Sequence, residues 1–289
     1  MILDIQPLGF HWQTYDPFLF CAYHHDQFPR GNGQFGPAAS LAGRKLGMDF
    51  EIRDGFRMYH GDKVPGFPAH PHRGFETITI VQQGLVDHSD SLGAAGRYGQ
   101  GDVQWLTAGR GIQHSEMFPL LKQTEANPLL LFQLWLNLPA KNKMAPPNFL
   151  MFWSDQLPRA QEQDSEGRAI RVEITAGAYG NTKALAPPPY SWAADPANHV
   201  AAWVIDLAAD AEWLLPAAAS GLNRALYFFE GADAQFDGMT VKVMNSMRLR
   251  SDQGLAIRNG AKPARLLMLQ GRPINEPVAQ HGPFVMNTR

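Results

Sequence analysis

The segment FETITIVQQGLVDHSDSLGAAGRYGQG, residues 75–101, carries the clearest indication of the fold. Ile78 and Ile80 alternate with threonines, which is the two-residue period of a β-strand whose faces meet different surroundings. A second extended run, LVDHSDS at 85–91, follows a turn that contains a glycine, and the glycine-rich stretch at 93–101 predicts a further turn. Short strands separated by turns are typical of a sandwich or a barrel, so we expect an all-β fold.

Extended runs continue along the chain on both sides of one segment of different character. GDVQWLTAG (101–109) and PLLLFQLWLNL (128–138) predict two more strands, and the second is apolar enough for burial on both faces. Residues 139–167 contain prolines, charges and a stretch near 148–157 with helical character, which predicts a linker with a short helix. The β pattern then resumes, with extended runs at 168–177, 199–207, 224–231, 239–243, 246–251, 254–260 and 264–271.

The chain length favours two domains. With 289 residues and about 150 residues per domain, two are expected. The ends of two predicted strands, IVQQG at 80–84 and YFFEG at 227–231, echo one another, which favours a duplicated β-barrel over two unrelated sandwiches. We therefore expect a first domain over 1–140, a linker over 141–167 and a second domain over 168–289.

Charge and composition exclude several classes of function. The net charge is −2, from 25 basic and 27 acidic residues, so no basic tail for nucleic acid is indicated. The first residues, MILDIQPLGF, lack a basic region, and acidic residues interrupt the most apolar later stretch, so neither a signal peptide nor a membrane span is predicted. The single cysteine, Cys21, fits a reducing compartment, and we expect a cytoplasmic protein.

Histidines are concentrated in the first part of the chain, where two motifs combine them with ligand-like spacing. In HPHRGFE (70–76), His70 and His72 project from the same face of an extended strand and can converge on one metal ion. GRGIQHSE (109–116) repeats this spacing with His114 and Glu116, after a turn built on glycines. Two such pairs on adjacent strands of one barrel would form a site of three imidazoles and one carboxylate.

This ligand set narrows the choice of metal. Three neutral imidazoles and a carboxylate, without a thiolate, suit Fe(II), Mn, Ni, Cu or Zn rather than Mg or Ca. Four protein ligands on an octahedral ion leave two positions open for a substrate and dioxygen, whereas a closed tetrahedral zinc site with the same ligands would be structural.

The fourth ligand is left open by the residue pattern. Glu76 is an even number of positions after His70 and His72, so on an unbroken strand its side chain would project from the same face as theirs. It could then be a ligand, or it could accept a hydrogen bond from a ligand imidazole. Spacing along the strands therefore does not decide whether Glu76 or Glu116 is the fourth ligand. Three further residues are candidates for the pocket: Arg73, Arg110 and Gln133. The arginines could hold an anionic substrate or form salt bridges in the barrel, and Gln133, polar within LLLFQLWL, needs an interior partner.

These motifs carry a family resemblance. The HxH pair, a glutamate shortly after it, Gly84 and a glycine-rich turn before a third histidine resemble the two-motif signature of cupins. HPHRGFETIT together with LTAGRGIQHSE, LWLNLP, KMAPP and the terminal GPFVMNT resembles the pirin family, a bicupin group, more closely. The PxG of the general cupin motif is absent, and TAG at 107–109 stands there, as is typical of pirins. The resemblance implies two jelly-roll β-barrels packed together and joined by a short linker helix.

The resemblance also implies which residues bind the metal. Pirin-like proteins hold one non-haem iron in the N-terminal cupin through the residues that correspond here to His70, His72, His114 and Glu116. The family thus favours Glu116 over Glu76 as a ligand. The second domain has no HxH pair at the corresponding place, RALYFFEGADAQF (224–236), so we expect a C-terminal cupin without metal ligands.

Two functions follow from the resemblance. The first is an iron-dependent quercetin 2,3-dioxygenase that opens the central ring of a flavonol with O2, in which Glu116 could act as a base. Its partners would be a small aromatic substrate and O2. The alternative is a redox- or metal-sensing module that binds another protein without turnover. Neither hypothesis involves direct nucleic-acid binding or a membrane.

Overall fold

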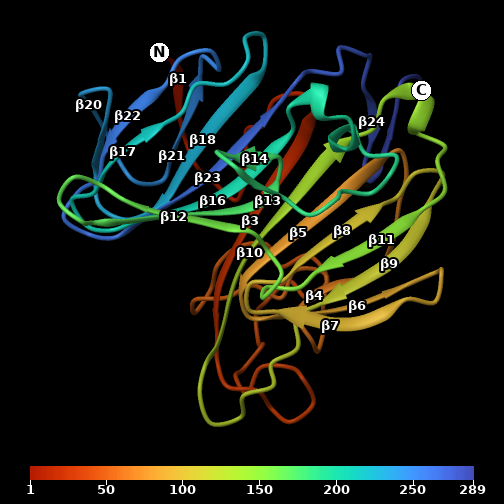
Figure 1. Cartoon of the computed structure of the whole chain (residues 1–289). Helices are drawn as coiled ribbons and strands as arrows, with labels where there is room; N and C mark the ends of the chain where they lie inside the picture. Colours follow the sequence, from red (N-terminus) through yellow and green to blue (C-terminus); the bar gives the residue numbers. More distant parts are fainter. The chain divides into compact units, whose positions relative to one another are not determined.

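The computed structural model describes the whole chain, Met1–Arg289, and its regular elements are β-strands apart from three short 3-10 helices (Figure 1). The chain divides into two compact units. The histidine-rich unit comprises Ala22–Ser154 and Pro277–Arg289, and the second unit comprises Met1–Cys21 and Asp155–Glu276. The all-β fold expected from the strand pattern is confirmed. The predicted limits 1–140, 141–167 and 168–289 stay a prediction.

Two antiparallel sheets contain most strands of the histidine-rich unit, which begins within β3, at Ala22. One has the order β11-β8-β5-β10-β3-β2, and the other has the order β4-β9-β6-β7. Their bounds are β2 (His11–Trp12), β3 (Phe18–Phe28), β4 (Gly66–His72), β5 (Phe75–Gln83), β6 (Leu85–Asp90), β7 (Ala95–Gly99), β8 (Val103–Thr107), β9 (Ile112–Met117), β10 (Asn127–Asn137) and β11 (Asn148–Phe152). The segment FETITIV forms most of β5, which lies between β8 and β10 and is buried along this length.

The predicted helix near 148–157 is wrong. Asn148–Phe152 is instead β11, which pairs antiparallel with β8 from Asn148 opposite Thr107 to Phe152 opposite Val103. An apolar run, FLMF, can serve either a helix or a strand, and here pairing with a distant strand decides the outcome. The nearest helical turn is the short 3-10 helix η1 (Ala140–Asn142). The glycine-rich stretch at 93–101 also differs from a simple turn, because β7 pairs with β6 within it.

The second unit has its own pair of sheets. A seven-stranded sheet has the order β1-β21-β18-β23-β16-β13-β12, and a four-stranded sheet has the order β17-β22-β19-β20. Their bounds are β1 (Ile2–Pro7), β12 (Arg159–Gln163), β13 (Ala169–Ala176), β16 (Ala201–Leu207), β17 (Glu212–Leu215), β18 (Asn223–Glu230), β19 (Ala234–Phe236), β20 (Met239–Val241), β21 (Asn245–Leu249), β22 (Leu255–Arg258) and β23 (Ala264–Gly271). Apolar side chains such as Trp203, Phe228 and Met268 fill the core of this unit.

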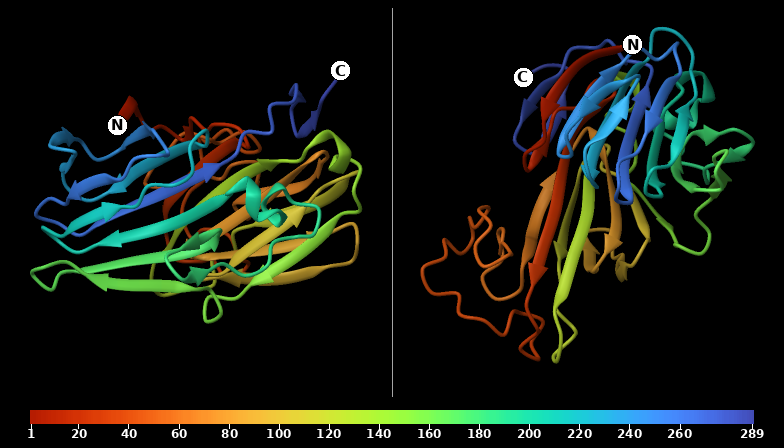
Figure 2. Two further views of the ribbon diagram at one scale, coloured as in Figure 1. Left: turned by 45° about the horizontal axis from the view of Figure 1, so that its top comes forward. Right: turned by 90° about the vertical axis from the view of Figure 1, so that its left-hand side faces the viewer.

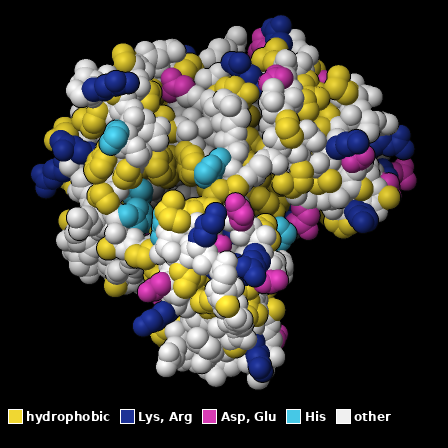
Figure 3. Space-filling view, turned by 180° about the vertical axis from the view of Figure 1, so that it is seen from behind, with side chains coloured by type: hydrophobic (Ala, Val, Ile, Leu, Met, Phe, Trp, Pro, Cys, Tyr) yellow, Lys and Arg dark blue, Asp and Glu magenta, His cyan; other side chains and the backbone are white.

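Short elements complete the chain: β14 (Ala178–Tyr179), β15 (Thr182–Lys183), η2 (Trp192–Ala194), η3 (Pro196–Asn198), β24 (Ala279–His281) and β25 (Phe284–Met286). In the histidine-rich unit, the segment between β3 and β4 has no regular strand or helix and forms the red and orange loops of Figure 2. No helix is long and apolar enough to cross a membrane. In the space-filling view of Figure 3, basic and acidic side chains are interspersed.

Candidate metal centre

Two neighbouring strands bring the predicted histidines together. β4 pairs antiparallel with β9, with His70 directly opposite His114 and Phe67 opposite Glu116. His72 is the last residue of β4, two positions after His70, so both imidazoles project from the same face. His72 and His114 are buried and His70 is half-buried, so His70 is the most exposed of the three.

The three imidazoles converge on one point through their Nε2 atoms. The Nε2 of His70 lies 3.1 Å from that of His72 and 3.0 Å from that of His114, and one ligand nitrogen from each ring lies within 4.8 Å of the others. Two nitrogens bound at about 2.1 Å to one ion, with a right angle between them, are about 3.0 Å apart. The spacing therefore fits ligands around a common ion, and this triad could hold a metal.

The protonation states also fit metal binding. The Nδ1 of His70 donates to the carbonyl oxygen of Pro68 at 2.8 Å, which orients the ring so that its Nε2 faces the other two imidazoles. Burial, followed by repulsion from His114 and His70, holds the pKa of His72 well below its usual value. Burial, followed by repulsion from His70 and His88, lowers the pKa of His114 to about 2. Neutral imidazoles packed this closely, with nitrogen facing nitrogen, are the form that a cation requires.

Glu116 lies beside the triad as a buried carboxylate. Its Oε2 is 3.8 Å from the Nε2 of His114, and its side chain is almost fully buried. Oε1 accepts the hydroxyl of Thr79 at 3.0 Å and that of Tyr98 at 3.4 Å, and Oε2 accepts the amide of Gln133 at 2.7 Å. Burial, and then the charge of Glu116, raise the pKa of Tyr98, so its phenol stays a hydrogen-bond donor. Direct ligation by Glu116 stays a prediction.

Glu76 is directed elsewhere because β4 and β5 are separate strands. Gly74, with a φ of +84°, interrupts the extended backbone between β4 and β5. The rule that residues an even number of positions apart share a face therefore does not hold between His72 and Glu76. On β5, Thr79 faces Glu116, and Glu76, three positions earlier, projects from the opposite face. There its Oε1 accepts the hydroxyl of Thr107 at 2.6 Å. The expectation that Glu76 faces the imidazoles is wrong.

The other predicted pocket residues fall into different surroundings. Gln133 is half-buried and bridges Thr79 and Glu116, so it has the interior partner that the sequence required. Arg73 is half-buried, follows His72 directly, and its guanidinium contacts the sulfur of Met144 at 3.2 Å. Arg110 is exposed, in the turn that leads to β9.

The structure adds polar residues that the sequence reasoning missed. Thr79 and Tyr98 hold the Glu116 carboxylate, and His88 and Asp90 lie on β6, next to β9. For β6 a signal existed: in DHSD (87–90), His88 and Asp90 share the spacing of the HPH motif. No comparable sequence signal identifies Thr79 or Tyr98. They come close to Glu116 only because the fold brings together strands that are separate in the sequence.

Comparison with known proteins agrees with this architecture. Residues 6–136 match the family described as Pirin, and residues 202–289 match the Pirin C-terminal cupin domain. The fold therefore consists of two cupin-type domains. A protein of Pseudomonas aeruginosa named "Putative quercetin 2,3-dioxygenase PA2418" is 37% identical over 226 residues, which cover 78% of this chain and 74% of that protein.

Two further proteins are similar. A pirin-like protein of Solanum lycopersicum is 37% identical over 227 residues, covering 78% of this chain and 72% of its own length. The crystal structure of a quercetin 2,3-dioxygenase from Acinetobacter baumannii aligns with a TM-score of 0.76 at 25% sequence identity, covering 100% of this chain and 92% of that one.

Proposed function

Because the chain belongs to the pirin family, we propose that it is a non-haem metal protein that opens the central ring of quercetin or a related flavonol with O2. The observation that carries this proposal is the convergence of three imidazoles on one point beside a buried carboxylate. The names of the relatives from Pseudomonas aeruginosa and Acinetobacter baumannii support the choice of substrate.

In this proposal His70, His72, His114 and Glu116 hold one divalent transition metal, Fe(II) in the resting protein, with Mn, Cu, Ni or Zn as substitutes. The metal would lower the pKa of the substrate hydroxyl and conduct electron density from the substrate to O2. The domain over 168–289 would carry no metal.

The residues of the chain supply orientation and proton transfer. Glu116 would accept the proton of the substrate hydroxyl, and Thr79, Tyr98 and Gln133 would keep its carboxylate in place through the hydrogen bonds given above. Because His70 is the most exposed imidazole, substrate would approach from its side. Arg73 would attract the anionic form of the substrate as it approaches.

Oxygen uptake tests the proposal. The protein, purified without oxygen and loaded with Fe(II), Mn, Cu or Ni, is mixed with quercetin in an oxygen electrode while the flavonol absorbance is followed. We expect O2 uptake with loss of flavonol for at least one metal, and at least a 100-fold slower reaction for His72→Ala. The matched control, His25→Ala, removes an exposed histidine of the same unit and should react like the parent. Bound metal without O2 uptake for any flavonol would contradict the enzymatic proposal and favour the metal-sensing module.

A further inference from the structure

A second histidine-carboxylate pair lies on the far side of β9 from His70. On β6, the Nε2 of His88 is 3.1 Å from the Oδ2 of Asp90, and both side chains have 0% exposed area. These residues are two positions apart on one strand, so they project from the same face of the sheet. The side chains of this pair are therefore shielded from solvent.

The register places this pair next to the candidate ligands. In the sheet order β4-β9-β6-β7, β9 is flanked by β4 and β6. Asp90 lies opposite His114, and His88 lies opposite Glu116. The rings of His88 and His114 are 5.4 Å apart at 63°, in an edge-to-face contact. His114 is thus held between His70 on one side and the His88–Asp90 pair on the other.

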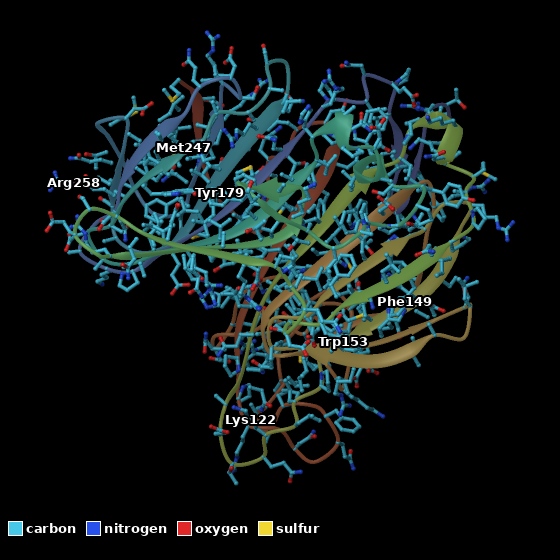
Figure 4. The ribbon with its side chains drawn as sticks, in the orientation of Figure 1. Lys122, Phe149, Trp153, Tyr179, Met247 and Arg258 are labelled. Atoms are coloured by element: carbon cyan, nitrogen blue, oxygen red, sulfur yellow. The ribbon has the colours of Figure 1, made fainter.

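The pair is itself fixed by its surroundings. The other carboxylate oxygen of Asp90, Oδ1, accepts the backbone N–H groups of Leu92 at 2.8 Å and Ala94 at 3.1 Å, in the turn between β6 and β7. The ring of Phe149, on β11 and labelled in Figure 4, packs against His88 with ring centres 5.1 Å apart. A turn and a neighbouring strand therefore restrict both side chains.

We propose that His88 and Asp90 are positioning residues for the metal centre. They hold the imidazole of His114 in the orientation that the metal requires, and so set the affinity and the coordination geometry of the metal. Outer partners of metal ligands typically change metal affinity by about 10–100-fold when they are removed. The inference rests on the metal centre of the proposed function, but not on the choice of substrate.

Cobalt(II) tests this role without turnover, because its visible spectrum reports the geometry of its ligands. We expect His88→Phe, which keeps a ring against Phe149, and Asp90→Ala to raise the dissociation constant for Co(II) about 10–100-fold, measured against a competing chelator, and to shift the visible bands. Asp90→Asn, which keeps hydrogen-bonding groups at this position, should stay within about threefold of the parent.

The matched control lies on the same strand. Asp87→Asn weakens the pair that Asp87 forms with Arg97 on the partly exposed face of β6. We expect no change in Co(II) affinity or spectrum for this variant. Circular dichroism in the aromatic region checks that each variant is folded. If His88→Phe is unfolded, the difference in Co(II) affinity between Asp90→Ala and Asp90→Asn tests the proposal.

Two negative results are distinguishable. If the parent protein binds Co(II) but all folded variants match its affinity and spectrum, or Asp90→Ala equals Asp90→Asn, the positioning role is wrong and the metal centre stands. If the parent protein, and not only the variants, fails to bind Co(II), the metal centre of the proposed function is wrong.

Discussion

His114 shows how burial prepares a single side chain for metal binding. Its ring lies among His70, His72 and His88, and its carboxylate neighbour Glu116 is 3.8 Å away. Burial makes protonation of this ring costly, and the adjacent imidazoles add repulsion. Burial and repulsion keep the ring unprotonated and available for a cation, and they also make the metal-free fold less stable in acid.

The metal-free protein should therefore lose stability as the pH falls. An unfolded histidine binds a proton near pH 6.5, but folded His114 does so only near pH 2, so the unfolded state gains protons first. The free energy of unfolding should decrease below pH 6.5 by about 1.4 kcal/mol per pH unit for each such histidine. The free energy of unfolding, measured with urea in the presence of a chelator, should decrease less between pH 7.5 and pH 5.5 for His114→Gln than for the parent. Equal losses would contradict this account of His114.

At this scale the structure brings together the three histidines of the HPH and HSE motifs, because their spacing places side chains on one face of a strand, whereas metal ligation by these residues and by Glu116 stays a prediction. Glu76 was misplaced for a local reason: parity is valid only along a continuous strand, and Gly74 interrupts it. The donors to Glu116 could not be predicted, since Thr79 and Gln133 meet only when β5 and β10 pair with Thr79 opposite Gln133.

At the scale of elements, the end of the chain holds the turn that follows the HPH motif. The N–H of Val285 donates to the carbonyl oxygen of Arg73 at 2.9 Å, and the N–H of Arg73 donates to that of Pro283 at 3.2 Å. The buried ammonium of Lys143 donates to the carbonyl oxygens of Gly74 and Val285 at 2.9 and 3.1 Å. The C-terminal hairpin β24–β25 is thus a structural part of the histidine-rich unit.

Gly74 should be intolerant of a side chain for this reason. A Cβ at Gly74 would lie 1.9 Å from the carbonyl oxygen of Val285, in addition to the strain of its positive φ. Gly93 has a similar φ of +89° but nothing within 4 Å of its Cβ position, so Gly93→Ala measures the backbone strain alone. We expect Gly74→Ala to lower the free energy of unfolding by about 2 kcal/mol more than Gly93→Ala. Equal effects in urea unfolding would show that the hairpin does not restrict this turn.

Strands were predictable where alternation or a long apolar run was strong, as for β5 and β10. The helix expected near 148–157 failed because the apolar run of β11 obtains its partner, β8, from about 45 residues earlier in the chain, and local pattern cannot report such pairing. The same limit applies to β7, whose glycines predict a turn but whose backbone groups pair with β6.

At the scale of the whole molecule, the buried histidines all lie in one of the two cupin-type units. The interior of the histidine-rich unit contains His88, Tyr98 and Glu116 as well as the triad, whereas Trp203 and Phe228 represent the apolar core of the second unit. Two domains could be predicted from length and internal similarity. The pairing of β1 with β21, which assigns the first strand to the second unit, could not, because it joins opposite ends of the sequence.

The most direct test of the account is the location of bound metal in crystals of the Fe(II)-loaded protein, by anomalous scattering at the iron edge. We predict one peak per chain, about 2.1 Å from the Nε2 atoms of His70, His72 and His114, and no peak in the second unit. A loaded protein without a peak at the triad, or with its only peak elsewhere, would contradict the assignment of the metal centre.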